Sequence, residues 1–337
     1  MRSSLFGFLL AMMFGFVGSA RAQFSPAERA KLIEDAKKEG KVVFYTGASA
    51  NDGNALKAAF EKKYPFLKME YFRAGKDKLL GKYLTEVRNN TFLPDVYQGS
   101  VFPLATLQQK GLLARYRSPE REAIHENLRA NDDYWAPVIL NAMTITYNTR
   151  LVKGDDIPKS YDDLLLPKWK GKLGLDLNKT EWYVAMMQTL GEERGRKYIE
   201  ALSRQNVQAR DGNTIIGQLL AAGEFSLVVS QYPTSVEEMK KSGAPIEWIA
   251  LQPHFVYAQV LALTAKNYHP SAGKLFIEYC LSEEGQQVLK GLSRITVRKD
   301  VLPNPPKLIQ GHNLLVLNPV SPDDYNRYNN EYHKYFR

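Results

Sequence analysis

The sequence contains very little cysteine, since Cys280 is the only one in 337 residues. No intramolecular disulfide can form, and no cysteine stands near the N-terminus to accept a lipid. Cys280 lies in an apolar stretch, 275–281, whose residues recur at helical spacing, which favours a small buried side chain over a reactive thiol. The fold must therefore be stabilised by its hydrophobic core.

Motifs of common enzymes are also missing. The segment 47–53 has the place of a phosphate-binding loop, but it lacks the Gly-x-Gly-x-x-Gly spacing and a Gly-Lys-Ser/Thr ending. There is no Gly-x-Ser-x-Gly elbow, and the five histidines are scattered without metal-ligand spacing. We therefore expect no enzyme, no cofactor and no metal site of this kind. A secreted enzyme is kept only as the least favoured of the functions considered below.

Long runs of charge of one sign are absent as well. The formal charge is +9, yet basic and acidic residues are mixed in runs such as 61–63 and 237–241. This mixture is typical of solvated helix faces and argues against a nucleic-acid partner. The positive excess favours an anionic small ligand by electrostatic steering.

The N-terminal segment carries the features of an export signal. Met1-Arg2 is followed by an apolar block, 5–17, and then by small residues up to Ala22. The block is shorter than the roughly 20 residues needed to cross a bilayer, and no later run approaches that length. The sequence predicts a signal peptide over 1–22, cleaved after Ala22, and a soluble periplasmic protein.

The rest of the chain alternates strands with helices. We expect strands at 41–46, 68–72 and 94–97, and helices at 26–38, 54–63, 76–88 and 104–111. Three successive β-α units indicate a mostly parallel sheet covered on both faces. A second series has strands at 172–177, 225–230 and 246–251, with helices at 181–189, 192–205 and 214–222.

Two β-rich runs connect these series. The run 135–147 is not followed by a helix, and the run 257–265 returns towards a helix expected over 270–289. Because the chain is too long for one core, we expect an α/β protein of two lobes joined by two hinge crossings. Lobe 1 comprises 23–140 plus 254–300, and lobe 2 comprises 141–253 plus 301–337. Tyrosines at spacings of three and four within 323–337 predict a helix that packs on a lobe.

Polar residues follow several strands, at the edge where open α/β sheets bind ligands. Helix N-termini at this edge favour an anion. The candidate ligand-binding residues are Thr46, Ser49, Arg73 and Ser100 in lobe 1, and Trp182, Arg210 and Tyr232 in lobe 2. Alternatives remain for each: helix capping for the hydroxyls, a surface ion pair for Arg210 and core packing for Trp182.

Six short stretches carry a resemblance to a known family. They are Lys-Lys-Glu-Gly-Lys-Val-Val-Phe-Tyr-Thr at 37–46, Pro-Asp-Val-Tyr at 94–97, Tyr-Asn-Thr at 147–149, Tyr-Asp-Asp-Leu-Leu at 161–165 with Pro-Lys-Trp-Lys-Gly-Lys at 167–172, and Leu-Ser-Glu-Glu-Gly-Gln at 281–286. In these the chain resembles the periplasmic binding proteins of type II fold that serve ABC importers, in the ferric-iron branch. The resemblance implies a monomer that binds a small molecule and delivers it to the permease subunits of an importer.

The same resemblance also bears on the identity of the ligand. Iron-binding relatives supply adjacent tyrosines, whereas this chain reads Gln231-Tyr232-Pro233, and Ser100 stands where an acidic ligand is expected. We therefore expect a small anionic organic or phosphorylated solute in the interlobe cleft. The alternative is ferric iron, or an iron chelate, with Tyr232 as a metal ligand.

Overall fold

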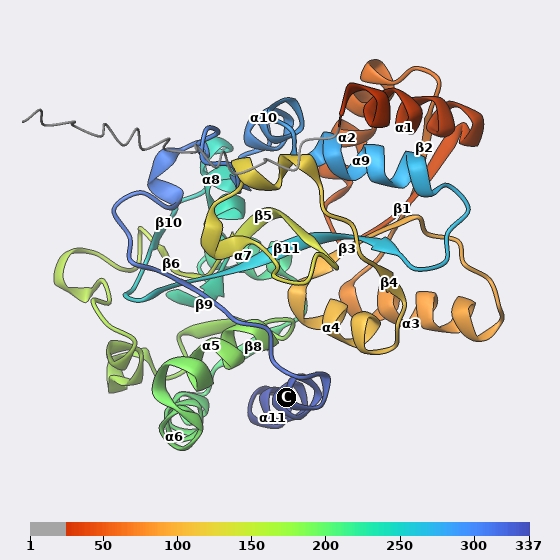
Figure 1. Ribbon diagram of the computed structural model, residues 1–337. Helices are drawn as coiled ribbons and strands as arrows, with labels where there is room; N and C mark the ends of the chain where they lie inside the picture. The colour runs from red at the N-terminus through yellow and green to blue at the C-terminus, as the bar shows by residue number, and fades with distance from the viewer. Residues whose placement is uncertain (1–24) are drawn as a thin grey trace, which may run out of the picture.

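The computed structural model describes residues 25–337 as an α/β molecule with two β-sheets, each flanked by helices (Figure 1). The expected fold class is confirmed. The predicted signal peptide, 1–22, lies outside the described residues, so its cleavage after Ala22 stays a prediction. None of the helices in residues 25–337 is both long and apolar enough to cross a membrane.

The larger sheet has the order β12-β5-β11-β3-β1-β2, and β4 and β13 also pair with β11. Strand β1 is parallel to β2 and β3, while β11 is antiparallel to β3 and β5. The strands are β1 (Lys41–Thr46), β2 (Lys68–Arg73), β3 (Val96–Ser100), β4 (Leu113–Ala114), β5 (Ala136–Ala142), β11 (His254–Thr264), β12 (Ile295–Thr296) and β13 (Leu314–Val316).

Helices cover both faces of the larger sheet (Figure 1). They are α1 (Pro26–Glu39), α2 (Ala50–Lys63), α3 (Lys76–Arg88), α4 (Val101–Gln109), α9 (Pro270–Leu281) and α10 (Glu283–Gly291). Phe276 packs edge-on against Phe44 of β1 and Phe60 of α2, with ring centroids 4.9 and 5.1 Å apart. These buried aromatic rings fasten the helices to the sheet.

The smaller sheet has the order β10-β6-β9-β7-β8, in which β7 is parallel to β8 and β9. Its strands are β6 (Thr144–Asn148), β7 (Leu173–Asp176), β8 (Gln208–Arg210), β9 (Leu227–Gln231) and β10 (Ile246–Ile249). Its helices are α5 (Thr180–Leu190), α6 (Glu192–Ser203), α7 (Asn213–Ala222) and α8 (Pro233–Lys241). Short 3₁₀ helices are η1 (Pro119–Ala123), η2 (Glu126–Leu128), η3 (Gly154–Asp156), η4 (Asp162–Leu165), η5 (Pro167–Trp169) and η6 (Pro306–Leu308).

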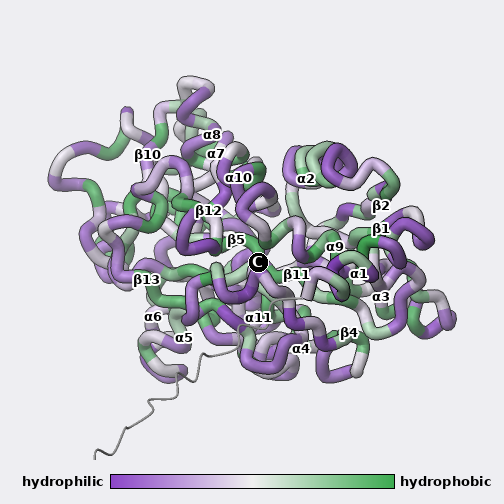
Figure 2. Tube along the Cα trace, turned by 45° about the horizontal axis from the view of Figure 1, so that its top comes forward, coloured by the Kyte–Doolittle hydropathy of each residue, from purple (hydrophilic) through white to green (hydrophobic). Residues whose placement is uncertain are grey.

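The chain passes twice between the sheets at closely spaced points. Strand β5 ends at Ala142 and β6 begins at Thr144, so the expected run 135–147 changes sheets at Met143. The second passage joins β10 to β11, and the amide of Met143 donates to the carbonyl of Phe255 at 2.9 Å. Strand β11 itself is buried along nearly its whole length and is largely hydrophobic in Figure 2.

The C-terminal part differs from the division expected from the sequence. Residues 301–337 were assigned to the second lobe, but β13 pairs with β11 in the larger sheet. Helix α11 (Pro322–Phe336) packs on α5 and α6 beside the smaller sheet and also on α4 beside the larger one (Figure 1). Tyr325, Tyr328 and Tyr332 form its buried face. The tail therefore contacts both parts of the molecule.

The expected helix 270–289 is also corrected, since it is broken at Ser282 into α9 and α10. Ser282 has an extended backbone, and its hydroxyl accepts a hydrogen bond from the amide of Gly285 at 3.3 Å. A serine that caps the next helix interrupts the previous one, because its ψ leaves the helical region.

Candidate functional site

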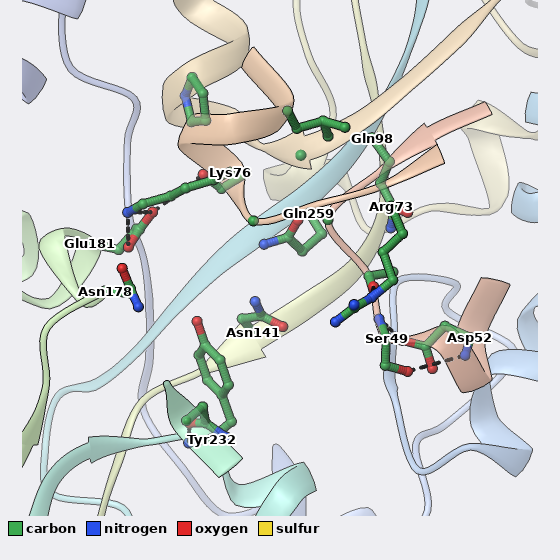
Figure 3. Close-up of a pocket in the computed structure, with 18 of the residues that line it drawn as sticks. Ser49, Asp52, Arg73, Lys76, Gln98, Asn141, Asn178, Glu181, Tyr232 and Gln259 are labelled. Carbon is green, nitrogen blue, oxygen red and sulfur yellow. Dashed lines mark hydrogen bonds and ion pairs between the residues drawn. The ribbon is translucent and has the colours of Figure 1, made fainter. Parts of the chain in front are cut away.

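A cavity of about 570 Å³ lies between the two sheets and is lined by residues from both sides. Figure 3 shows its polar side chains, among them Ser49, Arg73 and Gln98 from the larger-sheet side and Glu181 and Tyr232 from the smaller-sheet side. This volume is typical of a site for a small metabolite.

Five of the lining residues are the N-caps of helices. Ser49, Gly75 and Ser100 precede α2, α3 and α4, and Gly212 and Tyr232 precede α7 and α8. Each helix follows a strand, so the N-termini gather at the carboxyl ends of the parallel strands. Only Ser49 caps its own helix through its side chain; the other four make no such bond. The cavity wall therefore presents helix dipoles and backbone amides that favour an anion.

Basic side chains add to this field. Arg73 uses Nε to donate to the carbonyl of Ala48 at 2.7 Å. Within residues 25–337, neither Arg73 nor Lys78 forms an ion pair, and both line the cavity. Arg294, in contrast, is bound by Asp52 at 2.9 Å. Arg73 thus keeps the outer edge of its guanidinium for a ligand.

Glu181 is the most heavily bonded carboxylate of the cavity. It is 2% exposed and receives Lys76 at 3.3 Å, the hydroxyl of Tyr325 at 2.9 Å and the hydroxyl of Ser100 at 3.4 Å. Burial raises the pKa of the Glu181 carboxyl, but Lys76 and the hydrogen bonds outweigh it and the pKa lies below its usual range. Glu181 is on α5, Lys76 on α3 and Tyr325 on α11, so this contact joins both sides of the cleft.

Amide side chains form a neutral part of the wall. Gln98, Asn141 and Gln259 lie on the adjacent strands β3, β5 and β11 (Figure 3). The hydroxyl of Thr46 donates to Oε1 of Gln98 at 2.6 Å, which leaves the Gln98 amide nitrogen as a donor. The amide nitrogen of Asn141 donates to the Tyr257 hydroxyl at 3.1 Å, leaving its oxygen as an acceptor. Such groups suit the hydroxyls of a ligand.

Tyr232 closes the smaller-sheet side. Its hydroxyl lies 2.6 Å from the hydroxyl of Tyr257 on β11, and burial holds the pKa of the Tyr232 phenol well above its usual value. Behind it lies Lys179, whose ammonium is 2.9 Å from the centroid of the Tyr232 ring. Burial lowers the pKa of Lys179 to about 7, although Asp176 and Glu181 oppose the shift.

The structure brings together four of the seven residues proposed from the sequence. Ser49, Arg73, Ser100 and Tyr232 line one cavity. Thr46 does not line it; it is fully buried and orients Gln98 instead.

Trp182 and Arg210 also lie outside the cavity lining, contrary to expectation. Trp182 is 0% exposed and belongs to the buried part of the first turn of α5. Arg210 ends β8, the edge strand, and there its guanidinium donates to Ala209 and Gln208 and lies over the ring of Phe225. Trp182 takes the core-packing role that was its alternative, whereas Arg210 makes these local contacts instead of the surface ion pair that was its alternative.

Several lining residues were missed from the sequence: Lys76, Asn141, Glu181, Gln259 and Arg294. Asn141 and Gln259 did leave a signal, because each is a polar residue inside an otherwise apolar crossing strand. Lys76, Glu181 and Arg294 look like ordinary helix-end charges in the sequence.

No conventional metal cluster accompanies these residues. Within residues 25–337 there is no group of three or more His, Cys, Asp or Glu side chains placed to hold a metal ion. Two phenol oxygens, those of Tyr232 and Tyr257, are the only close oxygen pair from tyrosines described at this wall.

Two α/β lobes with a polar cavity between them, reached from helix N-termini on both sides, define a binding protein for small solutes. Residues 94–314 match the bacterial extracellular solute-binding proteins, and the chain belongs to this family. The resemblance found in the sequence motifs is confirmed.

Individual relatives are more distant. The chain is 21% identical to the Fe(3+)-binding periplasmic protein of Serratia marcescens over 229 residues, 65% of this chain and 67% of that protein. Iron-bound HitA from Pseudomonas aeruginosa has a TM-score of 0.75 at 20% identity, covering 88% of this chain and 99% of HitA. AfuA from Actinobacillus pleuropneumoniae, solved with exogenous fructose-6-phosphate, also has a TM-score of 0.75 at 20% identity, with 88% and 98% covered. At these identities the structural matches show the fold.

Proposed function

We propose that this chain is the periplasmic solute-binding component of an ABC importer and that it captures a small organic or phosphorylated anion between its lobes. The bound form is then delivered to the permease subunits of the importer. The periplasmic location and the delivery step follow the family and its relatives, which are periplasmic binding proteins.

The convergence of five helix N-termini on one cavity carries the proposal. Each N-terminus contributes a partial positive charge and amides that point at the same space. Arg73 adds a full charge with two nitrogen donors that make no ion pair in residues 25–337. A guanidinium binds carboxylate and phosphate through paired hydrogen bonds, so an oxyanion is the group that this wall accepts best.

The side-chain amides in the cavity wall indicate what the rest of the ligand, beyond its anionic group, should contain. Gln98, Asn141 and Gln259 present both donors and acceptors on three adjacent strands of the larger sheet, β3, β5 and β11. Hydroxyl groups can use both kinds of partner, whereas a purely apolar ligand would leave these amides unpaired. A hydroxylated anion, such as a sugar phosphate or a hydroxy acid, can bind both to the positive groups and to the amide side chains of the cavity.

Binding across the cleft also explains how delivery is coupled to capture. The ligand would touch Ser49 and Arg73 on one lobe and Tyr232 on the other. A ligand that contacts both lobes binds more tightly when they are close, so it shifts the population towards the closed arrangement. The importer can then distinguish loaded from empty protein.

The test is native mass spectrometry, with an optical spectrum, on the mature protein purified from a bacterial periplasm. A colourless protein that carries an organic or phosphorylated adduct supports the proposal and identifies the ligand. Calorimetric titration with fructose 6-phosphate and citrate then compares a sugar phosphate with a hydroxy acid. A protein that carries no adduct and binds neither compound contradicts the proposal.

Ferric iron is the second candidate, and the relatives favour it: one is an Fe(3+)-binding protein and another was solved with iron bound. In this chain the supporting feature is the pair of phenol oxygens of Tyr232 and Tyr257, 2.6 Å apart at the cavity wall. One hard cation could contact both oxygens once they are ionised. A coloured protein with a bound iron mass, or a visible band on adding ferric citrate, would establish iron as the cargo.

A further inference from the structure

Lys179 is a buried cation that the proposed site does not use. It is the residue before α5 and is only 1% exposed. Among residues 25–337 its ammonium has no hydrogen-bond partner, and the nearest carboxylate oxygen, Oδ2 of Asp176, is 4.0 Å away. An ammonium removed from water without hydrogen bonds is costly, so its burial calls for an explanation.

The neighbouring carboxylate does not provide one. Oδ1 of Asp176 accepts hydrogen bonds from the amides of Asn178 and Gly212, at 3.0 and 3.1 Å, and so holds two loops at the cleft edge. Glu181 is engaged by Lys76, Tyr325 and Ser100. Glu181 is thus committed elsewhere, and Asp176 reaches Lys179 only through Oδ2 at 4.0 Å, beyond hydrogen-bond distance.

The remaining contact is the face of the Tyr232 ring, 2.9 Å from the Lys179 nitrogen. A cation-π contact returns less free energy than burying an ammonium removes. Lys179 also stands at the start of a helix, where the dipole already favours negative charge. The ammonium therefore has a carboxylate oxygen of Asp176 at 4.0 Å but no hydrogen-bond acceptor among residues 25–337.

Tyr232 lies between Lys179 and the cavity space that its own ring lines. The side chain makes no capping hydrogen bond to α8 and is held by one hydroxyl contact, with Tyr257. Turning this ring away would break that hydrogen bond, the contact with Lys179 and the packing of the ring on the core, and it would open the ammonium to the cavity.

We propose that Lys179 is a second anion-binding group of the cleft, covered by the Tyr232 ring until a phosphate or carboxylate group of the ligand takes the place of the ring. The inference rests on the proposed function, because it adds a partner for the same anionic ligand. It places one basic group, Arg73, on the first lobe and another, Lys179, on the second. An oxyanion that reaches both would link the lobes directly.

The first experiment measures the accessibility of Lys179 without any natural ligand. Reductive methylation of the mature protein, followed by peptide mass spectrometry, gives a rate for each lysine. We expect Lys179 to react at least about tenfold faster in Tyr232→Ala than in the wild type, and inorganic phosphate to slow it again by about tenfold. Lys62, exposed on α2, is the internal control and should keep one rate throughout.

The second experiment removes the ammonium. Calorimetry should show that Tyr232→Ala binds inorganic phosphate about tenfold more tightly than the double variant Tyr232→Ala/Lys179→Met. The melting temperature of Lys179→Met serves as a control of folding, because the substitution removes a buried ammonium without hydrogen bonds but also removes the cation 4.0 Å from the buried Asp176 carboxylate.

Equal methylation of Lys179 in the wild type and in Tyr232→Ala overturns the proposal, as does equal phosphate binding by the single and double variants. These outcomes are independent of the natural ligand. If the wild type binds no organic or phosphorylated anion, the proposed function fails. Protection of Lys179 by phosphate in Tyr232→Ala would still support the covered site.

Discussion

Arg73 and Arg210 are both the last residues of parallel strands, but their surroundings differ. Arg73 lines the cavity and is exposed, whereas Arg210 is folded over Phe225 and donates to Ala209 and Gln208. Arg73→Met should weaken binding of the ligand found by mass spectrometry by about 10- to 100-fold, the range lost with a hydrogen bond to a charged group. Calorimetric titration checks this value.

Arg210→Met is the matched control. It makes the same chemical change at the end of another parallel strand, β8, outside the cavity. It should leave the affinity for the ligand within about twofold of the wild type. Equal losses for the two variants would mean that the cavity is not the ligand site, or that Arg210 reaches it in the bound form.

His254 gives the molecule a predicted sensitivity to acid. It is 0% exposed at the start of β11, neither ring nitrogen has a hydrogen-bond partner in residues 25–337, and the ring of His312 lies 5.0 Å away. Burial, and then the charge of His312, lower the pKa of His254 to about 4. The unfolded chain has a higher pKa and binds more protons, so stability is complete above about pH 6.5 and is lost as the pH falls towards 4.

The expected loss is about 2 kcal/mol between pH 7.5 and pH 5. Urea unfolding of the wild type and of His254→Leu at both pH values measures it, because the leucine variant cannot take up this proton. Between pH 7.5 and pH 5, the wild type should lose about 2 kcal/mol of unfolding free energy relative to His254→Leu. A constant difference would show that His254 is protonated in the folded protein without cost.

At the scale of residues, the sequence predicted which strand ends lie at the cavity better than it predicted which side chains point into it. Strand ends place a residue at the correct edge, which is why Ser49, Arg73, Ser100 and Tyr232 were found. They do not tell whether a side chain points into the cleft or back into the core. Trp182 follows a strand end as Ser49 does, yet its side chain is fully buried, while that of Glu181 beside it lines the cavity.

At the scale of elements, the start of α10 depends on a residue without a side chain. A Cβ on Gly285 would overlap the carbonyl oxygen of Tyr279, which is backbone and cannot move aside. Next to it, Gln286 ties the α9–α10 corner together by donating to the carbonyls of Val138 and Cys280 and accepting from the amide of Val297. Gly285→Ala should therefore cost about 3 kcal/mol of folding free energy, measured by urea unfolding.

Gly81→Ala is the control for this substitution. Gly81 is exposed within α3, and a Cβ there would meet nothing within 4 Å. Alanine should stabilise the protein by about 0.5–1 kcal/mol, because it lowers the backbone freedom of the unfolded chain. If both variants were equally stable, the corner at Ser282 would have to tolerate a shift of α10.

The same corner shows why elements were predicted unevenly. The range 76–88 was recovered as α3 without change, since its periodicity and ends are local properties. The corner at Ser282 is held by Gln286, which reaches Val138 in β5 and Val297 just after β12, and β13 depends on pairing with β11; Val138 and β11 are distant in sequence from the residues that they contact. Periodicity carries no information about such contacts.

At the scale of the whole molecule, Lys76, Glu181 and Tyr325 connect three separate parts of the chain. Lys76 is on a helix of the larger sheet, Glu181 on a helix of the smaller sheet, and Tyr325 on α11, which packs against both. The contact requires the lobes to be close, so it stabilises this arrangement even without a ligand. We predict that Lys76→Met favours a more open arrangement, because it leaves the buried Glu181 charge without its cation.

Spin labels on Lys62→Cys in α2 and Arg194→Cys in α6 can measure this, because both positions are exposed and the native Cys280 is fully buried. In the ligand-free protein, Lys76→Met should shift the distance distribution to longer values; a contact worth about 2 kcal/mol changes the ratio of open to closed forms roughly 30-fold. Lys78→Met, two residues away and without an ion pair in residues 25–337, should leave the distribution unchanged. An unchanged distribution in Lys76→Met would mean that the packing of α11 on α4 and α5 alone sets the distance between the lobes. The Lys76–Glu181 ion pair would then have no part in the equilibrium between open and closed forms.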